Sequence, residues 1–461
     1  MLKVVSELLT SLMISGTEKQ EVKMIERILN RKNIRRACKE VVSNKGSAGV
    51  DGMSVKELPE HLKTHLTAIA TAICNGSYRP SAILGVEIPK SNGKKRLLGI
   101  PTVVDRLLHQ AAHQVISLKF EPEFKDHSYG FRPGRNAHQA VQQAQKNIHE
   151  GYDYIVDIDL KSFVDEVDHG ILMQLLYRKV KCPITLRLLR KWLKAPIEID
   201  GKLTKRTKGV PQGSPLSPLL SNIMLHELDK ELERRGHRYV RYADDFSIYT
   251  KSKKAARRVG NSIFLFLRNR LKLPINCEKS GIRKPVQFAL LSHKFVPTYK
   301  KGEKGKYQAV VIDRKWKTLK EDLKAVTRKT TPSTFDERIA KLKEIQRGWI
   351  NYFRMASMQA KLKELDSWLR NRLRYCIWTD WKKPDRRRKN LIRLGIRNGK
   401  AYAWSRTRMG GWAVAQSPIL GTTITLERLI RRGYESMLSY YEKVSPQLNE
   451  PLYTRPVRTV V

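Results

Sequence analysis

Two pairs of aspartates stand in short apolar stretches of the chain. Asp244 and Asp245 are adjacent, whereas Asp157 and Asp159 alternate with apolar residues and therefore point to one face of a predicted strand. A turn explains adjacent acids, and a solvated strand face explains alternating ones. On a central strand, however, uncompensated carboxylates are costly, and bound cations would compensate them.

Carboxylates from two strands suit hard divalent cations. Mg²⁺ takes oxygen ligands, keeps some of its waters and lets substrate phosphates complete its shell. Two such ions about 4 Å apart would activate a 3′-hydroxyl and stabilise the pyrophosphate that leaves. Asp159, Asp244 and Asp245 are therefore candidates for a nucleotidyl-transfer site with two Mg²⁺ ions, for which Mn²⁺ could substitute.

Two stretches must position these acids. Residues 154–160 have the apolar character of a central strand, and residues 239–249 are typical of a hairpin that turns at the two adjacent acids. Around them, from residue 78 to about 295, short apolar runs alternate with helical patterns, which predicts an α+β domain with an antiparallel sheet. The chain before residue 78 is predicted to be helical, except for a glycine-rich loop at 44–52.

The charge of the chain points to its partner. Of 461 residues, 90 are Lys or Arg and 44 are Asp or Glu, a net charge of +46. Residues 301–461 hold 37 of the basic and 15 of the acidic residues, a net of +22. Such an excess repels itself, so we expect a polyanionic partner and disfavour a small-molecule metabolic enzyme. Residues 382–400, with nine basic residues and one acid, are interpreted as a linker into a last small domain.

The apolar stretches and the cysteines of the sequence indicate the cellular compartment. No stretch of 18 or more apolar residues occurs, so we expect no membrane partner. The five cysteines are scattered and form no Cys-x-x-Cys pair, which favours a reduced setting over disulfides or a zinc site. We therefore expect a cytoplasmic protein.

Residues 242–245, Tyr-Ala-Asp-Asp, resemble the signature of reverse transcriptases, and their neighbours resemble the group II intron-encoded branch. A lone Ala-Asp-Asp is weak, but further blocks follow in the order of that family from about residue 33 to beyond 380. Cysteine pairs of a nuclease domain do not follow, so the resemblance is to the bacterial reverse transcriptase/maturase without a C-terminal endonuclease domain. The further blocks are the fingers at 88–106, a block at 127–135, the first catalytic block at 159–169, the template-and-nucleotide block at 209–223 and the thumb at 348–353.

The resemblance implies an α+β fold: a right-hand polymerase, with fingers and a palm that contains an antiparallel sheet, followed by an α-helical thumb and a small basic C-terminal domain. Residues 1–77 would form an N-terminal helical extension with a template-contacting loop, and residues 78–300 the reverse transcriptase fingers and palm. Residues 301–383 would form the helical thumb or maturase domain, and residues 384–461 a basic domain that binds DNA or RNA.

The resemblance also assigns roles near the acids. Asp159, Asp244 and Asp245 would be catalytic and would hold the metals, with the Leu160 carbonyl as a backbone ligand. Lys90 and Arg96, on the fingers hairpin, would grip the nucleotide triphosphate, because a bidentate guanidinium and an ammonium neutralise phosphates. Without the carboxylates an ordinary basic turn would be the simpler interpretation of that pair.

Two further residues would contact the incoming nucleotide. Val164 stands where the family usually has an aromatic residue that faces the sugar, so weaker rejection of ribonucleotides is expected. Gln212 would lie beneath the nucleotide and the templating base, or would be an ordinary polar loop residue. Ser214 and Ser292 replace glycines of the family, which leaves the grip on the primer open.

The basic residues would bind template and intron RNA. The Trp residues among them are expected mainly to pack between helices, Trp368 included, whereas Trp404 and Trp412 could stack on bases. A solvated charged helix is the plainer interpretation of the basic run. The expected template or RNA contacts are Lys45, Gly46, Arg386, Arg387, Arg388 and Lys389.

The resemblance implies an RNA-directed DNA polymerase that binds its intron RNA to assist splicing and copies it during intron mobility. The expected partners are group II intron RNA, an RNA template with a DNA or RNA primer, target DNA and deoxynucleotides, with a homodimer left open. The expected setting is a bacterial cytoplasm. Two alternatives stay open: a domesticated relative in repair or defence, and an RNA-binding splicing maturase with dispensable polymerase activity.

Overall fold

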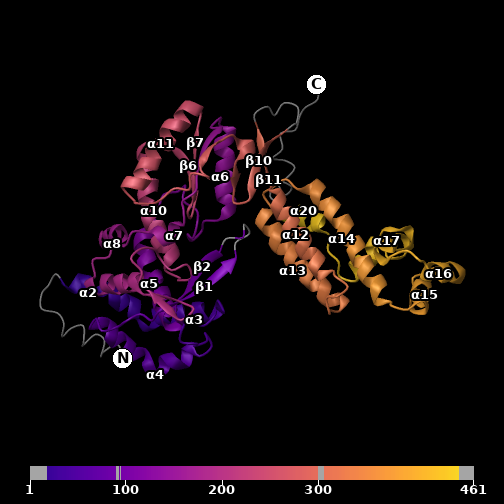
Figure 1. Ribbon diagram of the computed structural model, residues 1–461, viewed down its shortest axis with the longest axis horizontal. Coiled ribbons are helices and arrows are strands. Elements are labelled where there is room, and N and C mark those ends of the chain that lie inside the picture. The colour runs from indigo at the N-terminus through magenta and orange to yellow at the C-terminus, as the bar shows by residue number, and fades with distance from the viewer. Residues whose placement is uncertain (1–17, 90–92, 94, 299–305, 446–461) are drawn as a thin grey trace. The chain divides into compact units, whose positions relative to one another are not determined.

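The structure is a computed structural model that describes residues 18–89, 93, 95–298 and 306–445. The chain divides into two compact units, Met1–Lys284 and Pro285–Val461, called the first and second unit below (Figure 1). Each unit encloses its own hydrophobic core. None of the helices in the described residues is long and apolar enough to cross a membrane.

A four-stranded sheet carries the aspartates of the first unit. Its order is β6-β7-β3-β8, and all neighbouring strands are antiparallel. The internal place of β3 confirms the predicted central strand, and β6 and β7 form the predicted hairpin. The strands are β3 (Tyr154–Ile158), β6 (Arg238–Tyr242), β7 (Asp245–Thr250) and β8 (Gly281–Arg283).

A second sheet of the first unit has the order β2-β1-β4-β5. Its hairpin β1–β2 is antiparallel, whereas β1 and β4 run parallel. A parallel pair needs a long crossover, and the chain between β1 and β4 includes the helices α5 to α9 and strand β3. The strands are β1 (Ile83–Pro89), β2 (Lys95–Ile100), β4 (Ile197–Ile199) and β5 (Lys202–Thr204).

Helices supply most of the core of the first unit. α5 is buried along most of its length and begins at Thr102, whose hydroxyl accepts a hydrogen bond from the Asp105 amide. α11 packs against β3 and β7, and α6 packs against β6 (Figure 1). The helices are α2 (Glu18–Leu29), α3 (Arg31–Ser43), α4 (Leu58–Cys74), α5 (Val103–Phe120), η1 (Glu121–Glu123), α6 (Ala137–His149), α7 (Phe163–Glu166), α8 (His169–Tyr177), α9 (Pro183–Lys194), α10 (Ser217–Arg234) and α11 (Lys253–Asn269).

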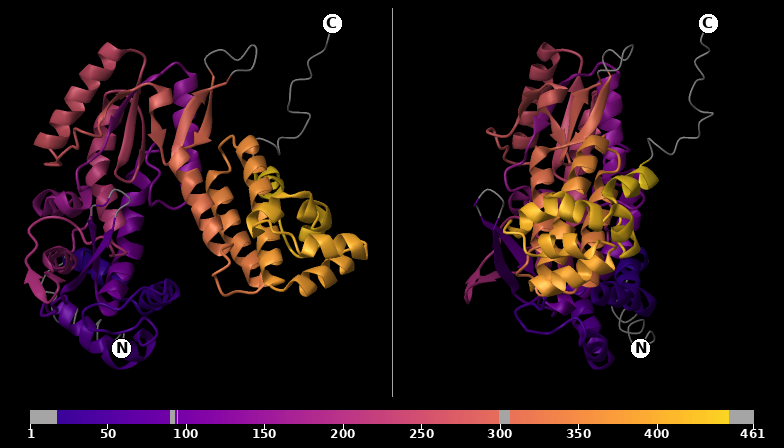
Figure 2. Two further views of the ribbon diagram at one scale, coloured as in Figure 1. Left: turned by 45° about the vertical axis from the view of Figure 1, so that its right-hand side comes forward. Right: turned by 90° about the vertical axis from the view of Figure 1, so that its right-hand side faces the viewer.

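The second unit begins with a small antiparallel sheet of order β11-β10-β9 and continues as helices. The helices α12, α13 and α14 pack together, and the C-terminal helix α20 packs on α13 and α14 (Figure 2). These first elements are η2 (Pro285–Gln287), β9 (Ala289–Leu290), β10 (His293–Pro297), β11 (Tyr307–Val311), α12 (Asp313–Val326), α13 (Phe335–Phe353) and α14 (Gln359–Asp380).

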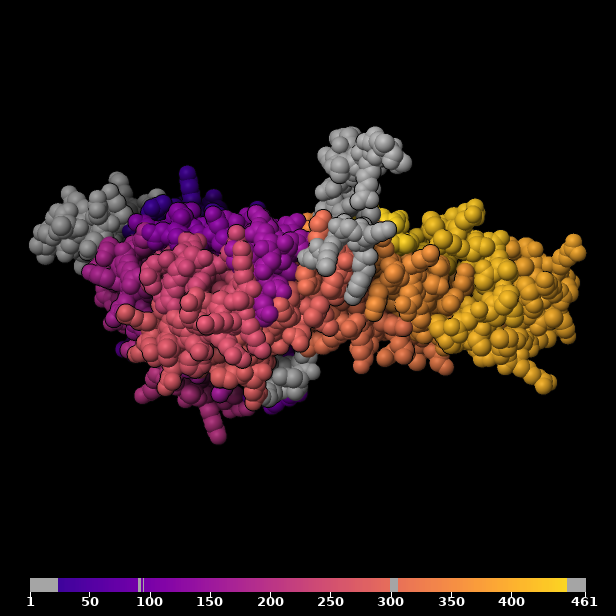
Figure 3. All heavy atoms as spheres, turned by 90° about the horizontal axis from the view of Figure 1, so that it is seen from above, coloured from indigo at the N-terminus to yellow at the C-terminus, as the bar shows by residue number. Residues whose placement is uncertain are grey.

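The predicted leucine stripe of α14, from Leu362 to Ile377, is buried as expected. The basic segment 382–400, interpreted as a linker, instead forms α15 and the start of α16, because Pro384 is placed in the first turn of a helix, where its missing N–H costs nothing. Figure 3 shows part of these last helices at the surface, although each of them also buries side chains in the core of the second unit. They are α15 (Pro384–Arg393), α16 (Asn398–Ser405), α17 (Gly411–Gln416), α18 (Pro418–Thr423), α19 (Leu426–Arg431) and α20 (Met437–Val444).

Candidate active site

The two adjacent acids lie at a tight turn between β6 and β7. Tyr242 pairs with Asp245 across the hairpin, which leaves Ala243 and Asp244 as the turn residues. Ala243 has a left-handed φ of 58°, a conformation that L-residues adopt only under constraint. A Cβ atom at Gly130 would lie 2.3 Å from the Ala243 nitrogen, so a neighbouring loop presses directly on this turn.

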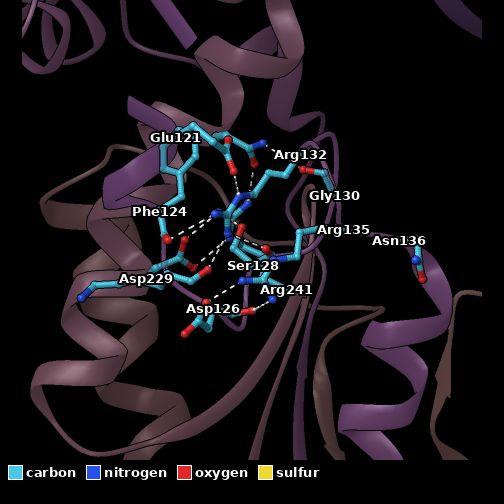
Figure 4. A network of polar contacts seen from close by, with 12 residues as sticks. Glu121, Phe124, Asp126, Ser128, Gly130, Arg132, Arg135, Asn136, Asp229 and Arg241 are labelled. Atoms are coloured by element: carbon cyan, nitrogen blue, oxygen red, sulfur yellow. Dashed lines mark hydrogen bonds and ion pairs between the residues drawn. The ribbon is translucent and has the colours of Figure 1, made fainter. Parts of the chain in front are cut away.

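A buried guanidinium fixes the turn from behind. Arg241 is fully buried and pairs with both carboxylate oxygens of Asp229, at 2.8 and 2.6 Å. Its Nη1 also donates to the Ala243 carbonyl, at 2.9 Å, and to the Asn222 side chain. Its Nη2 donates to the Ser128 hydroxyl at 2.6 Å (Figure 4). We call these residues the Arg241 network; it ties the backbone of the β6–β7 turn to α10.

A second arginine holds the loop that presses on the turn. Arg132 pairs with Glu121 at 2.8 Å and donates to the carbonyls of Phe124, Lys125 and Ser128 (Figure 4). The loop's Gly130 carbonyl accepts from Asn222 of the Arg241 network. Buried charges persist only where partners satisfy them, so this arrangement fixes the loop and turn together.

Asp159 follows directly after β3, next to the turn in the sheet. Its Oδ2 accepts a hydrogen bond from the Asn276 side chain at 2.9 Å and lies 3.4 Å from the Lys279 ammonium. Its backbone nitrogen donates to the Ser280 hydroxyl at 3.0 Å. Asp157, on the same strand, pairs with Arg283 at 2.8 Å and so has a cation of its own. Lys279 and Ser280 thus both contact Asp159.

The carboxylates repel one another. Asp245 is exposed at the surface, and the protein atoms around its carboxylate still displace part of its water. This desolvation, and then repulsion from Asp244, Asp159 and Asp157, raises the pKa of Asp245 to about 6. A cation placed among these oxygens would relieve the repulsion.

The acid cluster fits hard divalent ions by its chemistry. All of its donors are carboxylate oxygens, which Mg²⁺ prefers, and the Lys279 ammonium already lies beside Asp159. Within the described residues, no three His, Cys, Asp or Glu side chains are already arranged to hold a metal ion. Leu160 pairs with Ile275 in an isolated bridge, and the proposed role of its carbonyl stays a prediction.

The β1–β2 hairpin holds the predicted triphosphate contacts. Arg96 lies on β2 opposite Ile88 and is exposed, whereas Lys90 lies outside the described residues. The loop that follows Val210 packs on this hairpin, since a Cβ atom at Gly213 would lie 2.3 Å from the Gly99 carbonyl oxygen. Only glycine allows this approach. The hairpin and the loop that carries Gln212 are thereby joined.

A backbone hydrogen bond ties Val164 to the loop that carries Gln212. The Val164 carbonyl accepts a hydrogen bond from the Val210 nitrogen at 2.8 Å, two residues before the half-buried Gln212. Ser214 is buried, and its hydroxyl lies 2.9 Å from the His109 Nδ1 on α5. The serine that replaces a glycine is therefore accommodated by a specific partner.

The other departure, Ser292, lies in the turn between β9 and β10. Leu291 and Ser292 both have left-handed φ values, 49° and 66°. The family's glycine would adopt this conformation without strain, and a serine does so at a cost. The Leu291 carbonyl accepts a hydrogen bond from the Tyr352 hydroxyl at 3.3 Å.

The predicted RNA contacts belong to different units. Lys45 and Gly46 follow α3, where the Ser47 carbonyl accepts a hydrogen bond from Arg106 at 2.5 Å. In α15, Arg387 lies over the Trp378 ring, 4.5 Å from its centroid, and Arg388 donates to the Asn398 side chain. Of the four predicted contacts on α15, Arg386 and Lys389 are exposed and Arg387 and Arg388 are half-buried.

Sequence reasoning missed the residues behind the acids. Arg241 stands beside the signature in the middle of a buried strand, which was a usable signal. Its partners Asp229 and Ser128 lie 12 and 113 residues away in sequence, and no local pattern connects them.

Comparisons with known proteins agree with this geometry. The family "Reverse transcriptase (RNA-dependent DNA polymerase)" matches residues 88–295, which include all three catalytic candidates. The family "Group II intron, maturase-specific domain" matches residues 316–395. The chain thus carries a reverse transcriptase domain followed by a maturase-specific domain.

Individual relatives point the same way. Protein YkfC of Escherichia coli is 32% identical over 53% of this chain and 75% of its own length. The group II intron-encoded protein LtrA of Lactococcus lactis is 30% identical over 53% of this chain and 52% of its own length, so the chain spans about half of LtrA. A chain of the partial Cas6-RT-Cas1–Cas2 complex is 24% identical over 53% of this chain and 42% of its own length, with a TM-score of 0.33. The protein belongs to the group II intron reverse transcriptase/maturase family.

Proposed function

We propose that this protein is an RNA-directed DNA polymerase whose catalytic residues are Asp159, Asp244 and Asp245. The observation that carries the proposal is that Asp159, directly after β3, and Asp244 and Asp245, at the β6–β7 turn, lie at one end of the same sheet, inside a matched reverse transcriptase domain. A cluster of mutually repelling acids in a protein of net charge +46 is costly unless cations are part of its function.

The three aspartates and the Leu160 carbonyl would hold two Mg²⁺ ions, or Mn²⁺ in their place. When bound, the ions would lower the pKa of the primer 3′-hydroxyl and stabilise the leaving pyrophosphate. The protein's own part is to hold the acids in register. The Arg241 network fixes the Ala243 carbonyl, and Asn276 and Ser280 hold Asp159 from the other side.

The nucleotide would lie between the β1–β2 hairpin and the loop after Val210. Arg96, with Lys90, would contact the triphosphate. Gln212, carried by the loop that packs on Gly99, would lie beneath the base. Val164, tied to that loop through Val210, would line the sugar.

Primer extension tests the proposal. Extension of a DNA primer on an RNA template with deoxynucleotides and Mg²⁺ should be lost in Asp244→Ala. The matched control is Asp153→Asn, because Asp153 lies just before β3 and pairs with Lys284, away from the proposed metal ligands. Wild-type extension no faster than that of Asp244→Ala would refute the polymerase function.

The proposed place of Val164 has its own test. A small side chain beside the sugar leaves room for a 2′-hydroxyl, so Val164→Phe should reject ribonucleotides more strongly than the wild type, on the order of tenfold for a steric contact of this size. Competition between deoxynucleotide and ribonucleotide during extension measures it. Equal discrimination by the two proteins would remove Val164 from the nucleotide site.

We also propose that the protein binds group II intron RNA, assists its splicing and copies it into target DNA. The maturase-specific match at residues 316–395 and the net charge of +22 over residues 301–461 support this second activity. Lys45 and Gly46 in the first unit, and Arg386 and Lys389 on the surface of α15, would contact RNA. Residues 301–383, which include α12 to α14, would act as thumb and residues 384–461 as the basic nucleic-acid-binding domain.

Splicing of a group II intron RNA encoded next to this protein tests this activity, where the flanking DNA encodes one. The protein should accelerate splicing at low Mg²⁺, and its affinity for the intron should fall with log salt by about 0.7–0.9 per phosphate neutralised. A flat salt response would contradict the RNA contacts. Extension without splicing would favour a domesticated polymerase of repair or defence, and splicing by Asp244→Ala would show that polymerisation is dispensable for the maturase.

A further inference from the structure

A cavity in the second unit combines cations with aromatic rings. It measures about 500 Å³ and lies between α12, α14 and α17, and α14 packs on both of the other helices (Figure 1). Ligand cavities of several hundred Å³ are typical for small molecules. We call it the lysine–tryptophan cavity; its lining is Lys317, Lys320, Glu321, Lys324, Trp368, Arg372 and Trp412.

The lysines gather on one face of α12. Lys317, Lys320 and Lys324 are spaced at i, i+3 and i+7, so they point to the same side of the helix. In the described part of the chain, none of the three forms an ion pair with a carboxylate, whereas Lys361 of α14 pairs with Asp313. Three unpaired lysines beside one Glu321 leave a concentrated positive field.

The fourth cation is held in place. Arg372 donates from Nε to the Thr327 hydroxyl at 3.0 Å and from Nη2 to the Thr327 carbonyl at 2.6 Å. Its guanidinium lies over the rings of Tyr375 and Trp412, 5.4 and 5.5 Å from their centroids. A guanidinium fixed in this way loses little entropy when it binds an anion.

The two indoles supply flat apolar surface next to these cations. Trp368 and Trp412 are half-buried, pack against the core and line the cavity, so part of each indole is open to the cavity. Lys320 lies 5.3 Å from the centroid of the Trp368 ring, and an anion bound by that lysine would therefore lie beside the ring. Trp368 was expected to pack only between helices, and it lines the cavity as well.

We propose that the lysine–tryptophan cavity receives one unpaired nucleotide of a single-stranded nucleic acid, with its base against the indoles and its phosphates on the lysines. A base needs a flat apolar surface, and its phosphates need cations within one nucleotide's length. A duplex keeps its bases stacked inside and offers only phosphates. This site deepens the proposed RNA binding, on which it rests, by naming the element of RNA that is read.

Binding of short labelled oligonucleotides tests the site. The probe is an unstructured RNA decamer with one 2-aminopurine, compared with a DNA decamer of the same sequence and with a decamer RNA duplex. The single strands should quench tryptophan fluorescence and have their own fluorescence quenched, and the duplex should not. Tighter binding of the RNA strand would identify RNA as the source of the nucleotide, and equal binding would identify any single strand.

Variants separate stacking from charge. Trp412→Ala should weaken single-strand binding on the order of tenfold, the effect of one lost base stack, and Trp412→Phe should restore most of it. Lys320→Ala/Lys324→Ala should weaken binding and lower the salt slope by about 0.7 for each lost phosphate contact. The matched control is Lys363→Ala, an exposed lysine of α14 that does not line the cavity.

Two results would overturn the site. The first is an equal loss of single-strand and duplex affinity in Lys320→Ala/Lys324→Ala, which would indicate a general phosphate surface. The second is no larger effect in that variant and Trp412→Ala than in Lys363→Ala. If instead the full protein binds neither decamer nor intron RNA, the proposed RNA binding itself fails. Primer extension tests the polymerase function independently of these binding results.

Discussion

Each unit contains a fully buried aspartate, and the two are satisfied in different ways. Asp229 of the first unit pairs with the charged Arg241, with both side chains fully buried. Asp366 of the second unit accepts only from neutral donors, the Tyr434 and Ser436 hydroxyls and the backbone nitrogens of Met437 and Leu438, at 2.6 to 3.0 Å. Both satisfy a buried charge, but only the first extends to the candidate active site.

The difference shows what each aspartate orders. The guanidinium of Arg241 has donors left after it pairs with Asp229, and one of them holds the Ala243 carbonyl of the β6–β7 turn. Asp366 lies on α14 and binds the N-terminus of α20, where unpaired backbone N–H groups favour a negative charge. A charge pair thus positions a site in the first unit, and a helix cap fastens the last helix in the second.

The largest effect is expected from breaking the buried ion pair. Arg241→Met leaves Asp229 buried without its cation and should destabilise the first unit by about 3–5 kcal/mol, with loss of primer extension. Asp229→Leu/Arg241→Met removes both charges and should recover much of the stability. Urea denaturation followed by tryptophan fluorescence gives the free energy of unfolding, and extension assays give the activity.

The double variant distinguishes positioning from mere stability. It folds without the donor to Ala243, so we expect its maximal extension rate to stay low while its KM for deoxynucleotide changes little. A double variant that is both stable and fully active would show that Arg241 only fills space in the core.

Asp366→Ala should be the next largest effect and should be confined to the second unit. It removes one acceptor of four hydrogen bonds and leaves partly buried donors without a partner, which costs about 2–4 kcal/mol. Hydrogen exchange at α20 should speed up while exchange at β3 and β7 stays unchanged. Ser436→Ala, which removes a single donor to Asp366, is the graded control and should cost about 1 kcal/mol. Faster exchange throughout both units would contradict the local role.

Acid should destabilise the first unit more than the second, because ten of the 11 histidines lie in residues 1–284. Burial lowers the pKa of six of them, that of His109 to about 3. Near pH 6.5 these histidines bind protons in the unfolded chain but not in the folded first unit. The stability of the first unit is therefore constant above that pH and falls between about pH 6.5 and 3.

Thermal unfolding at pH 7.5 and 5.5 measures this window. The melting temperature of the first unit should fall more than that of the second. The free energy of unfolding should fall by up to about 1.4 kcal/mol per pH unit for each buried histidine. His109→Gln should reduce the shift if the variant folds, and His65→Gln, an exposed histidine of α4, is the control. Equal shifts of both units would rule out this origin.

The sequence predicted what depends on local pattern. Alternation identified β3, the apolar runs around Asp244 identified the hairpin, and helical spacing identified the buried face of α14. It could not show that Arg241 reaches Asp229 on α10, because that contact exists only once the helix covers the sheet. It also mistook the basic segment 382–400 for a linker, since its net charge hid the few apolar positions, such as the buried Leu391, that anchor α15.

The smallest effect is expected where a charge pair is exposed. Arg347 of α13 and Glu435, just before α20, form two hydrogen bonds at 2.8 and 3.0 Å, with side chains 49% and 29% exposed. The hydrogen bonds from Arg347 lower the pKa of Glu435. Yet water and salt screen such a pair, so Glu435→Gln should cost only about 0–1 kcal/mol, less again in 1 M salt. Urea denaturation at two salt concentrations measures this cost. A salt-independent loss as large as that of Asp366→Ala would show that the exposed pair stabilises α20 as much as the buried Asp366 does.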